Sequence, residues 1–446
     1  MKFSLLAQRV FDDIENHGGK VYIVGGSVRD EYLGVHDGHD VDVEVYHMSY
    51  TQLKDVLSHH GHVNTFGHSF AIMQLEQLQG YDFALPRQEK KIGDKHQDFE
   101  IMVDSQLPIE KAVLRRDLTM NALMYDYQES QIIDLCGGID DINQRIIRCV
   151  HPQTFIEDPL RVLRIAQFVA RFEMRVEENT KQLCMAMVKD HMLDALSKER
   201  VYDEYCKILM SSRPSLGFEF LKEIGALPDY LYRLVETPQR LDFHPEGHVF
   251  NHTMLVIDIA ALMKDKTDHP LWFMWSCLFH DIGKPVVTTP DGRAPLHNEA
   301  GVEVFKKIKI ISSRKQREYI STMIMYHMHL MNMSRNHSSD VKYLRLLKKI
   351  ENKVSLNDLI AISCCDKLGR GRVVYQQYHD FIDYIEDKKQ RLGVHALQAV
   401  VDGHDLIENG FLQKKKYKEI LDEAYELQLS GMSKEKILRS LKKKYE

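Results

Sequence analysis

Acidic and apolar residues alternate along Asp40-Val41-Asp42-Val43. This short run limits the possible folds of the N-terminal part of the chain more than any other feature there. Alternation with a period of two is typical of a β-strand, in which every second side chain points to the same face. The two carboxylates are then expected on one face, with their backbones about 7 Å apart, close enough to converge on one divalent cation. Because Mg²⁺ prefers oxygen ligands, the run predicts a magnesium site formed by Asp40 and Asp42.

A phosphate-binding turn is predicted a short step upstream. The apolar run 21–24 predicts a second strand, which ends at Gly25-Gly26 and is followed by a helical pattern that carries Arg29. Backbone N–H groups in such a turn can point at phosphate, and an arginine adds a permanent positive charge. Taken alone, a Gly-Gly turn or an acid pair also fits an ordinary turn or a solvated surface strand. Their order and spacing together predict a magnesium-dependent reaction on a nucleoside triphosphate.

The length of 446 residues exceeds what one compact core usually holds, so several domains are expected. No apolar run is long enough to span a bilayer, and the first residues lack the apolar core of a signal peptide. The cysteines show no paired CxxC spacing, which predicts free thiols in a reducing compartment. The sequence therefore predicts a cytoplasmic protein without a membrane segment.

A net charge of −6 means that a nucleic-acid partner would have to bind a local basic surface. One candidate is the segment 412–446, which holds ten basic and six acidic residues. A solvated helical face explains the same composition equally well. Within this segment Lys414, Lys415 and Lys416 can contact a phosphate backbone.

Strand and helix signals mix in the N-terminal part of the chain, and helical patterns dominate from residue 137 almost to the end. The polar stretch 87–98 has few apolar residues and predicts a loop. Asp158-Pro159 predicts a helix start, because a capping residue precedes a proline at the first helical position. Further strands are predicted at 40–45, 70–75, 81–85 and 132–135. The order of these patterns predicts an α+β fold.

The segment 115–123 is dense in hydrogen-bonding groups and contains Arg116, Asp117 and Asn121. Arg116 can bind phosphate, and Asp117 can accept a hydrogen bond from a ribose hydroxyl. A purely structural Arg–Asp pair beside a helix cap is the alternative.

Asp158 and Arg161 stand three residues apart and share a helix face, which Arg164 continues. An aspartate accepts from an exocyclic amine, and an arginine donates to a ring nitrogen or carbonyl. Cytosine and adenine both present an amine beside a ring acceptor, whereas guanine and uracil do not. The pair can therefore favour C and A, although a simple salt bridge is the commoner meaning of this spacing.

The ordered segments VGGSVRD, HDVDVEV, RRDLTMNAL, DLCGGIDDI and EDPLRVLR resemble those of the bacterial class II tRNA nucleotidyltransferases. These are the CCA-adding enzymes, with poly(A) polymerases as relatives, and the resemblance covers most of the chain. It implies a polymerase-β-like nucleotidyltransferase head with a small mixed sheet, followed by all-α parts. The implied domains are the head at 1–136, a neck with a base-reading helix at 137–212, a body at 213–243, an HD domain at 244–372 and a tail at 373–446. Residues 134–142 match the head–neck hinge and residues 87–98 the flexible loop of the family.

The same resemblance implies roles for single residues of the head. Asp40 and Asp42 look like the catalytic acids that hold magnesium. Gly25, Gly26 and Arg29 look like contacts to the triphosphate of the nucleotide. All five residues lie in the matching segments.

Further nucleotide-binding residues are implied in the next two segments. Arg116 and Asp117 look like the groups that hold the ribose, with Asn121 beside them. The residues that look like a protein template for the incoming base are Asp158, Arg161 and Arg164. Gln167 is a departure, because it stands where many members continue the basic row.

A histidine series follows in the C-terminal half. Its members, in the order H…HD…D on predicted helices, are His252, His280, Asp281 and Asp366. Imidazoles and carboxylates are good ligands for divalent transition metals, although a lone histidine on a helix is more often an ordinary core or surface residue. His297 and His327 lie between the four and are further candidate ligands.

This series resembles the HD phosphohydrolase domain, which implies a divalent metal such as Ni, Mn, Co or Mg. A metal-bound water has a lowered pKa and can attack a phosphoester, while Lys284 can steady the phosphate. His244 and His248 fall outside the pattern and are expected to be ordinary loop residues.

Together these features predict an RNA nucleotidyltransferase that adds CCA to tRNA 3′ ends from CTP and ATP and releases pyrophosphate, with a phosphohydrolase activity in the HD domain. A poly(A) polymerase, or an enzyme that adds only CC or only A, is an alternative of the same chemistry. An HD phosphohydrolase with a non-catalytic RNA-binding head is an alternative of another class, against which Asp40 and Asp42 argue. The oligomeric state is not predicted.

Overall fold

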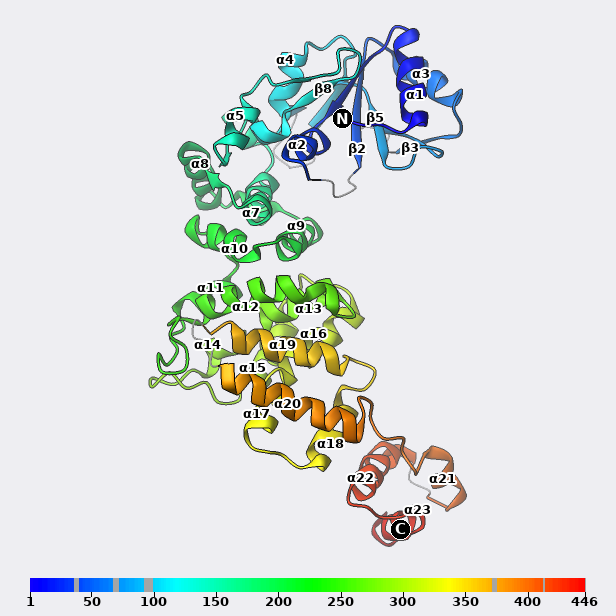
Figure 1. The fold of residues 1–446 in the computed structure, drawn as a ribbon, viewed down its shortest axis with the longest axis vertical. Helices are drawn as coiled ribbons and strands as arrows, with labels where there is room; N and C mark the ends of the chain where they lie inside the picture. The colour runs from blue at the N-terminus through cyan, green and yellow to red at the C-terminus, as the bar shows by residue number, and fades with distance from the viewer. Residues whose placement is uncertain (36–39, 67–71, 92–98, 371–374, 412–413, 446) are drawn as a thin grey trace. The chain divides into compact units, whose positions relative to one another are not determined.

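The computed structural model describes residues 1–35, 40–66, 72–91, 99–370, 375–411 and 414–445. The chain forms two compact units, Met1–Leu227 and Pro228–Glu446, whose elements are labelled in Figure 1. The first unit combines a sheet with helices, while the described residues of the second form helices and no strand. The predicted α+β class is confirmed, whereas the finer domain boundaries stay predictions.

A mixed seven-stranded sheet forms the centre of the first unit, in the order β3-β4-β5-β2-β1-β8-β9. β2 lies antiparallel to β1, with Val43 opposite Ile23, and parallel to β5, with Asp42 opposite Asp82. Val43, Ile23 and Phe83 are buried, which explains why their alternating pattern forms strands. The strands are β1 (Lys20–Val24), β2 (Val41–Tyr46), β3 (Val63–Phe66), β4 (Ile72–Leu75), β5 (Tyr81–Ala84), β8 (Met124–Asp126) and β9 (Gln131–Ile133).

Three helices pack on this sheet. α1 (Leu5–Asn16) contacts β1 and α3 (Tyr50–Ser58), and α2 (Gly26–Leu33) contacts β1 and β2. The turn from β1 into α2 needs a glycine, because Gly25 adopts a left-handed φ of 76°. The predicted turn after residues 21–24 is therefore present, and β2 begins one residue after Asp40.

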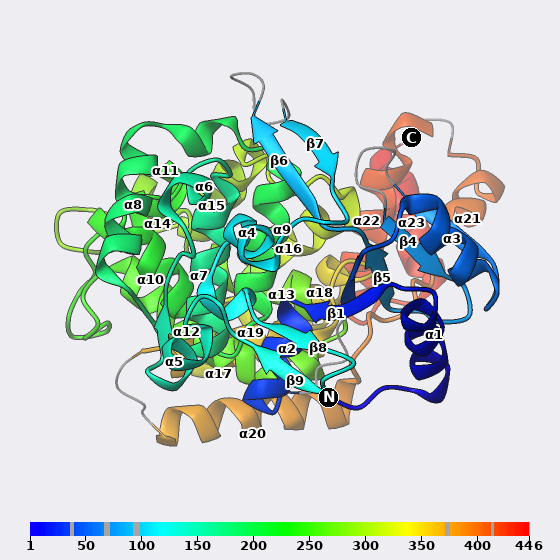
Figure 2. The same ribbon diagram turned by 90° about the horizontal axis from the view of Figure 1, so that it is seen from above.

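The predicted loop at 87–98 is wrong in its first part. Arg87–Lys91 forms strand β6, which pairs antiparallel with β7 (Phe99–Val103), as Figure 2 shows. A polar sequence can form such a ladder because strand pairing satisfies the backbone groups whatever the side chains are. Residues 92–98 lie outside the described residues, as do the first two residues of the strand predicted at 70–75.

The rest of the first unit is mainly helical. α7 (Leu160–Phe172) packs against α9 (Lys198–Met210) and α10 (Pro214–Glu223). The Asp134 carboxylate accepts hydrogen bonds from the backbone of Gly138 at 2.9 Å and Ile139 at 2.8 Å, and so caps a short helix. The remaining elements are α4 (Ile109–Ala112), η1 (Val113–Arg115), η2 (Thr119–Asn121), α5 (Gly138–Asn143), β10 (Ile146–Ile147), α6 (Pro152–Phe155), β11 (Arg175–Val176), α8 (Glu178–Lys189) and η3 (Met192–Ala195).

The second unit is built around α12 (Val249–Met263) and α13 (Pro270–Phe279). These two helices contact each other and α19 (Leu356–Leu368), and α13 also contacts α16 (Arg314–Tyr326). Phe273, Trp275 and Phe279 are fully buried in this core. The other helices of this unit up to residue 392 are α11 (Asp229–Glu236), η4 (Lys264–Lys266), α14 (Lys284–Val287), α15 (His297–Lys307), α17 (His329–Arg335), α18 (Asp340–Ile350) and α20 (Tyr375–Leu392).

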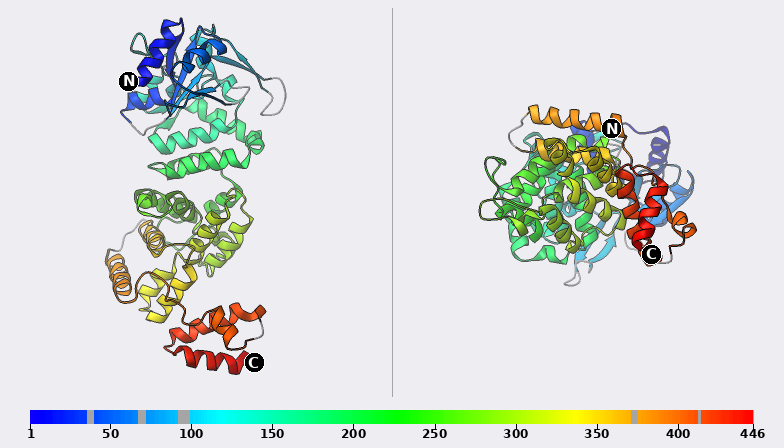
Figure 3. Two further views of the ribbon diagram at one scale, coloured as in Figure 1. Left: turned by 90° about the vertical axis from the view of Figure 1, so that its right-hand side faces the viewer. Right: turned by 90° about the horizontal axis from the view of Figure 1, so that it is seen from below.

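The C-terminal helices, drawn in orange to red in Figure 3, share a small core of their own. Leu406, Phe411, Ile420, Ile437 and Leu441 pack together in it. The elements are α21 (Gly403–Glu408), η5 (Lys414–Lys416), α22 (Tyr417–Leu429) and α23 (Lys434–Tyr445). No helix in the described ranges is long and apolar enough to cross a membrane.

Candidate functional sites

A cavity of about 680 Å³ in the first unit brings most of the predicted nucleotide-binding residues together. It lies between the β1–α2 turn, the 3₁₀ segment η2 and helix α7. The predicted residues in its lining are Gly25, Gly26, Arg29, Asp42, Arg116, Asp117, Asn121 and Arg164. Among the residues that the structure describes, Asp40, Asp158 and Arg161 do not line it.

Asp42 lies directly beside the glycine turn. A Cβ atom placed on Gly25 would lie 3.6 Å from Oδ2 of Asp42 and 3.4 Å from a guanidinium nitrogen of Arg116. Burial raises the pKa of Asp42, against the opposite effect of Arg116, and the negative charges of Asp82, Glu44 and Asp40 raise it further. This concentration of carboxylates fits a cation, because a bound divalent ion would neutralise their mutual repulsion.

A chain of buried hydrogen bonds holds the charged groups of the cavity. Nε of Arg29 donates to Asp30 at 2.8 Å, and its Nη1 donates to Oδ1 of Asn121. Nδ2 of Asn121 donates to Asp117 at 2.9 Å, and Nε of Arg164 donates to the other oxygen of Asp117 at 2.6 Å. Although burial alone would raise it, the charge of Arg164 holds the pKa of Asp117 below its ordinary value. The guanidinium groups are therefore fixed before any ligand binds.

Glu44 anchors the two consecutive arginines of the same region. Its carboxylate pairs with Arg115 and, at 2.7 Å, with Nη2 of Arg116. Burial opposes ionisation of Glu44, but the charges of Arg116 and Arg115 hold its pKa below the ordinary value. The sequence analysis did not single out Glu44, which follows Asp42 by two residues on β2.

One face of α7 contributes further residues that sequence reasoning missed. Phe168 and Phe172 line the cavity, and the guanidinium of Arg29 lies 5.2 Å and 4.9 Å from their ring centroids. Arg164 also stacks on Phe168 at 5.5 Å. Phe168 and Phe172 stand four and eight residues after Arg164, which places these side chains on one helix face, and this spacing is a signal that can find them. Gln167, noted as a departure, also lines the cavity.

Asp158 and Arg161, predicted to face an incoming base, are bound to protein groups in this structure. The Asp158 carboxylate pairs with Arg200 at 3.1 Å and accepts from the backbone N–H of Leu160 at 3.0 Å. The Arg161 guanidinium donates to the carbonyl oxygens of Thr154 at 2.6 Å and Arg115 at 2.7 Å. Their predicted role in base reading stays a prediction.

The second unit brings the whole histidine series together from α12, the end of α13, α15, the end of α16 and α19. The Asp281 carboxylate lies 3.2 Å from Nε2 of His280, 3.4 Å from Nε2 of His297 and 3.9 Å from Nε2 of His327. Nε2 of His252 lies 3.1 Å from Asp366 and 3.8 Å from Asp281. The residues of this group, all buried, are His252, His280, Asp281, His297, His327 and Asp366.

Three of these imidazoles have the orientation of metal ligands. Nδ1 of His280, His297 and His327 lies 2.7, 2.9 and 2.8 Å from the carbonyl oxygen of the residue three positions earlier. If Nδ1 carries the proton, Nε2 keeps its lone pair and points toward the other residues of the histidine–aspartate group. The buried Nε2 atoms of His280 and His297 make no hydrogen bond within the described structure. Burial lowers the pKa of His327 to about 3, so that its imidazole is neutral. These residues fit a divalent metal.

A cavity of about 300 Å³ opens beside the histidine–aspartate group. Its lining combines Asp281, His297, His327 and Asp366 with cationic side chains. Lys284 lies 2.6 Å from Asp281. The cationic residues are Arg240, Lys284, Arg293, Arg335 and Arg370. This surrounding fits an anionic ligand.

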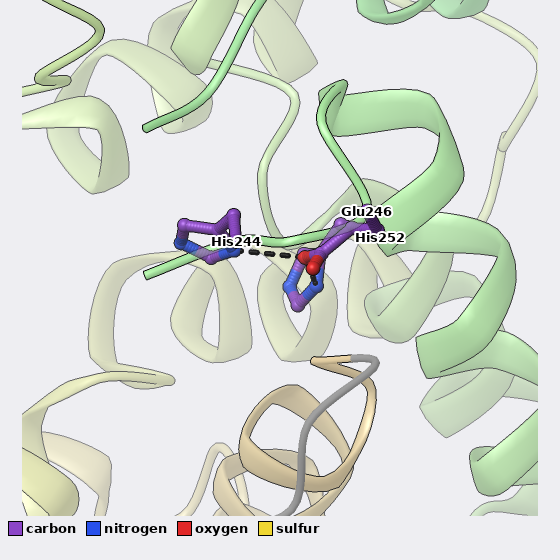
Figure 4. A group of neighbouring side chains, drawn as sticks. All are labelled: His244, Glu246 and His252. Carbon is purple, nitrogen blue, oxygen red and sulfur yellow. Dashed lines mark hydrogen bonds and ion pairs between the residues drawn. The ribbon is translucent and has the colours of Figure 1, made fainter. Parts of the chain in front are cut away.

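The expectation that His244 is an ordinary loop residue is wrong. His244 lines this cavity, and its Nδ1 lies 2.9 Å from the carboxylate of Glu246, which in turn contacts His252 (Figure 4). The sequence pattern missed the contact because only the fold of the segment before α12 brings His244 against His252.

Comparisons with known proteins give matches in both units. Residues 21–148 match a family model described as "Poly A polymerase head domain", and residues 249–368 match one described as "HD domain". Residues 173–231 match a "Probable RNA and SrmB- binding site of polymerase A". A "Multifunctional CCA protein" of Stenotrophomonas maltophilia (strain K279a) is 32% identical over 371 residues, which cover 80% of this chain and 87% of that protein. The chain belongs to the multifunctional CCA protein family.

Other members of the multifunctional CCA protein family are also similar. The protein of Methylobacillus flagellatus is 37% identical over 298 residues, covering 65% of this chain and 68% of its own length. The solved structure of "Thermotoga maritima CCA-adding enzyme complexed with tRNA_CCA" has a TM-score of 0.59 at 19% identity and covers 99% of this chain and 95% of that one. "The complex structure of CCA-adding enzyme with CTP" has a TM-score of 0.63, also at 19% identity. The match covers 99% of this chain and 95% of that one. These two structures share the fold, and the predicted family resemblance is confirmed.

Proposed function

We propose that this protein adds C, C and A to the 3′ end of tRNA from CTP and ATP and releases pyrophosphate. The relatives named multifunctional CCA proteins support this function. The observation that carries it is the convergence of Asp42, the Gly25-Gly26 turn and the guanidinium groups of Arg29, Arg116 and Arg164 on one cavity. Such a cavity combines a cation site with several groups that bind phosphate.

The chain's own residues would bind and orient the reactants. Asp40 and Asp42 would hold Mg²⁺, which when bound activates a 3′-hydroxyl and neutralises the leaving pyrophosphate. Backbone N–H groups of the glycine turn and the side chain of Arg116 would bind the triphosphate. Asp117 accepts from two donors at Oδ1, so a ribose hydroxyl would approach its Oδ2, beside Arg164.

Replacing Asp42 tests this function. Asp42→Asn should lower the rate of CMP and AMP incorporation by about 10³-fold, because catalysis relies on positioning and charge neutralisation. The assay uses tRNA transcripts that lack CCA or only the final A, with one labelled triphosphate at a time. Asp55→Asn is the matched control, since Asp55 is exposed on α3. A near wild-type rate for Asp42→Asn would contradict the proposal.

The same assay separates the alternatives. Repeated AMP addition to an unrelated RNA would identify a poly(A) polymerase, and incorporation of only CMP or only AMP would identify a partial enzyme. No pyrophosphate release with CTP and tRNA would favour an RNA-binding head without catalysis. Cytoplasmic localisation is part of the proposal, because all seven cysteines are unpaired.

We further propose that Asp158 and Arg161 pair with the incoming base. Arg161 stands three residues and Asp158 six residues before Arg164, which lines the cavity, so a small rearrangement at the start of α7 and just before it would bring them to a bound nucleotide. Asp158 must then exchange its partner Arg200 for the base amine. Asp158→Asn should therefore relax the preference for C and A by about 10-fold or more while transfer continues.

Arg200→Ala is the matched control for this prediction. It removes the ion pair but keeps the proposed reading group, so base preference should be retained. The ratios of kcat/KM for the four triphosphates measure the preference. Unchanged ratios in Asp158→Asn would exclude the template role.

A second activity is proposed for the HD domain, as a metal-dependent phosphohydrolase. The buried histidine–aspartate group beside a cation-lined cavity supports it. Asp281→Ala should abolish phosphatase or 2′,3′-cyclic phosphodiesterase activity, assayed on RNA 3′ ends with Ni²⁺, Mn²⁺, Co²⁺ or Mg²⁺ added. Equal activity of the variant and the wild type would contradict this assignment.

A further inference from the structure

His252 differs from the other histidines of the metal group in how its ring is held. His280, His297 and His327 each direct Nδ1 to a carbonyl oxygen three residues earlier in the chain. His252 lies inside the first turn of α12, and the carbonyl oxygen of Val249 already accepts from the hydroxyl of Thr253 at 2.9 Å. Its ring instead has its Nδ1 partners outside the helix.

Glu246 provides that partner. Its Oε1 lies 2.9 Å from Nδ1 of His252, while the carbonyl oxygen of Gly369 lies 3.2 Å from the same nitrogen. The opposite nitrogen, Nε2, faces Asp366 at 3.1 Å. A proton held at Nδ1 by a carboxylate leaves the lone pair of Nε2 free for a metal.

The carboxylate of Glu246 is itself held in place. Its side chain is only 4% exposed, and Nδ1 of His244 lies 2.9 Å from Oε1 on the other side. Nδ2 of Asn251 donates to the backbone oxygen of Glu246 at 2.9 Å. Figure 4 shows both imidazoles next to the carboxylate, each joined to it by a dashed line. Its second oxygen, Oε2, is buried without a hydrogen bond in the described structure, so the interactions concentrate on Oε1.

We infer that Glu246 is a positioning residue, which fixes the orientation and tautomer of His252 so that Nε2 binds the HD metal, with His244 holding Glu246. This inference rests on the proposed metal site. A carboxylate that receives the second N–H of a ligating histidine raises the affinity for the metal by about 10–100-fold. The ligand atoms of His244, Glu246 and His252 also lie within 4.8 Å of one another, so a second ion bound by these three is the competing assignment.

Cobalt binding to the full-length, metal-free protein tests the inference. Co²⁺ is titrated by calorimetry, and its d–d absorption reports the ligands of the ion. Glu246→Gln keeps the shape but removes the charge, and should weaken Co²⁺ binding about 10-fold. Glu246→Ala should weaken it further and change the absorption, while the stoichiometry of the histidine-liganded ion stays that of the wild type. In the phosphohydrolase assay, the metal concentration for half activation should rise while kcat at saturating metal changes little.

Two variants are the references for this titration. Glu236→Gln is the matched control, because Glu236 is exposed at the end of α11, and it should bind Co²⁺ like the wild type. Asp281→Asn should lose the histidine-type absorption; if it does not, the proposed metal site itself fails, whatever Glu246 does. Wild-type affinity and spectrum in both Glu246 variants would overturn the positioning role. If the wild type binds two Co²⁺ ions and Glu246→Ala binds only one, the positioning role is also overturned, and Glu246 is a metal ligand.

Discussion

At the scale of single residues, the head cavity is organised by carboxylates that hold arginines. Asp30 fixes Arg29, Glu44 fixes Arg116, and Asp117 fixes Arg164. Guanidinium groups held in this way lose little further freedom when a triphosphate binds, and the charge they offer is already oriented. Asp30 and Glu44 would therefore contribute to the binding of a triphosphate without touching it.

Asn121 connects two of these pairs, because it accepts from Arg29 and donates to Asp117. Asn121→Ala should destabilise the first unit by about 1–3 kcal/mol, since it leaves buried polar groups without their partner. It should also raise KM for CTP and ATP, because Arg29 loses an anchor. Denaturant unfolding and steady-state kinetics measure the two effects. The control is Asn143→Ala, whose side chain only accepts a 3.3 Å hydrogen bond from Tyr32 at the surface. Equal behaviour of both variants would exclude this role.

Acid should destabilise the metal-free protein through His327. Burial lowers its pKa to about 3 from the ordinary 6.5. Between these two values the unfolded chain binds a proton that the folded chain does not, so stability is lost as pH falls below about 6.5. The loss from this group approaches 1.4 kcal/mol per pH unit. Urea unfolding at pH 7.5, 6.5 and 5.5 measures the slope. His327→Gln should reduce the slope, and an unchanged slope would contradict the assignment.

Ligand-type residues with a characteristic spacing can be predicted from the sequence even where they meet across the fold, whereas the contacts that hold them in place cannot. The Gly25-Gly26 turn and Asp42 lie on neighbouring segments, so their spacing carries the signal. Glu246 meets Asp281 and Asp366 only through His252, and no local pattern distinguishes it from a surface glutamate. The predicted site in the head therefore lacks the anchoring acids Asp30 and Glu44, and the predicted histidine site lacks its outer partner.

At the scale of elements, periodicity predicts most helices and the central strands. Strand β6 is the exception, because its sequence is polar and its pairing with β7 is what defines it. The start of β2 after Asp40 also depends on backbone pairing with β5, which begins at Val41 opposite Tyr81. Hydrophobic patterns indicate buried faces, so they do not identify strands that are defined by backbone pairing.

The contact between the segment after α13 and helix α15 depends on Gly283. A Cβ atom there would lie 2.1 Å from the carbonyl oxygen of His297 and 2.3 Å from the backbone nitrogen of Gly301. Because backbone atoms cannot move away cheaply, Gly283→Ala should cost about 1–3 kcal/mol of stability. It should also displace His297 and weaken Co²⁺ binding.

Thermal unfolding and Co²⁺ titration of Gly283→Ala measure these effects. Gly403→Ala is the matched control, since a Cβ atom at this helical glycine meets nothing within 4 Å. A wild-type Co²⁺ affinity in Gly283→Ala would show that α15 tolerates the added methyl group without moving its histidine.

At the scale of the whole molecule, each compact unit contains one complete candidate site. The residues that line the head cavity all precede Leu227, and the histidine–aspartate group with its cavity follows Pro228. Each unit also has its own buried core, around Ile23 and Phe83 in the first and around Trp275 and Phe279 in the second. The two chemistries can therefore be separated along the chain.

Expressed separately, residues 1–227 and 228–446 should each fold cooperatively, because domains with their own hydrophobic core can fold alone. The first fragment should bind CTP with an affinity within about threefold of that of the full chain, since every lining residue is present. The second should bind Co²⁺ with the wild-type spectrum. Calorimetric unfolding and ligand titration measure both. If the first fragment is unfolded, or binds CTP only when the second is added, the nucleotide site requires both units and the independence of the two sites is disproved.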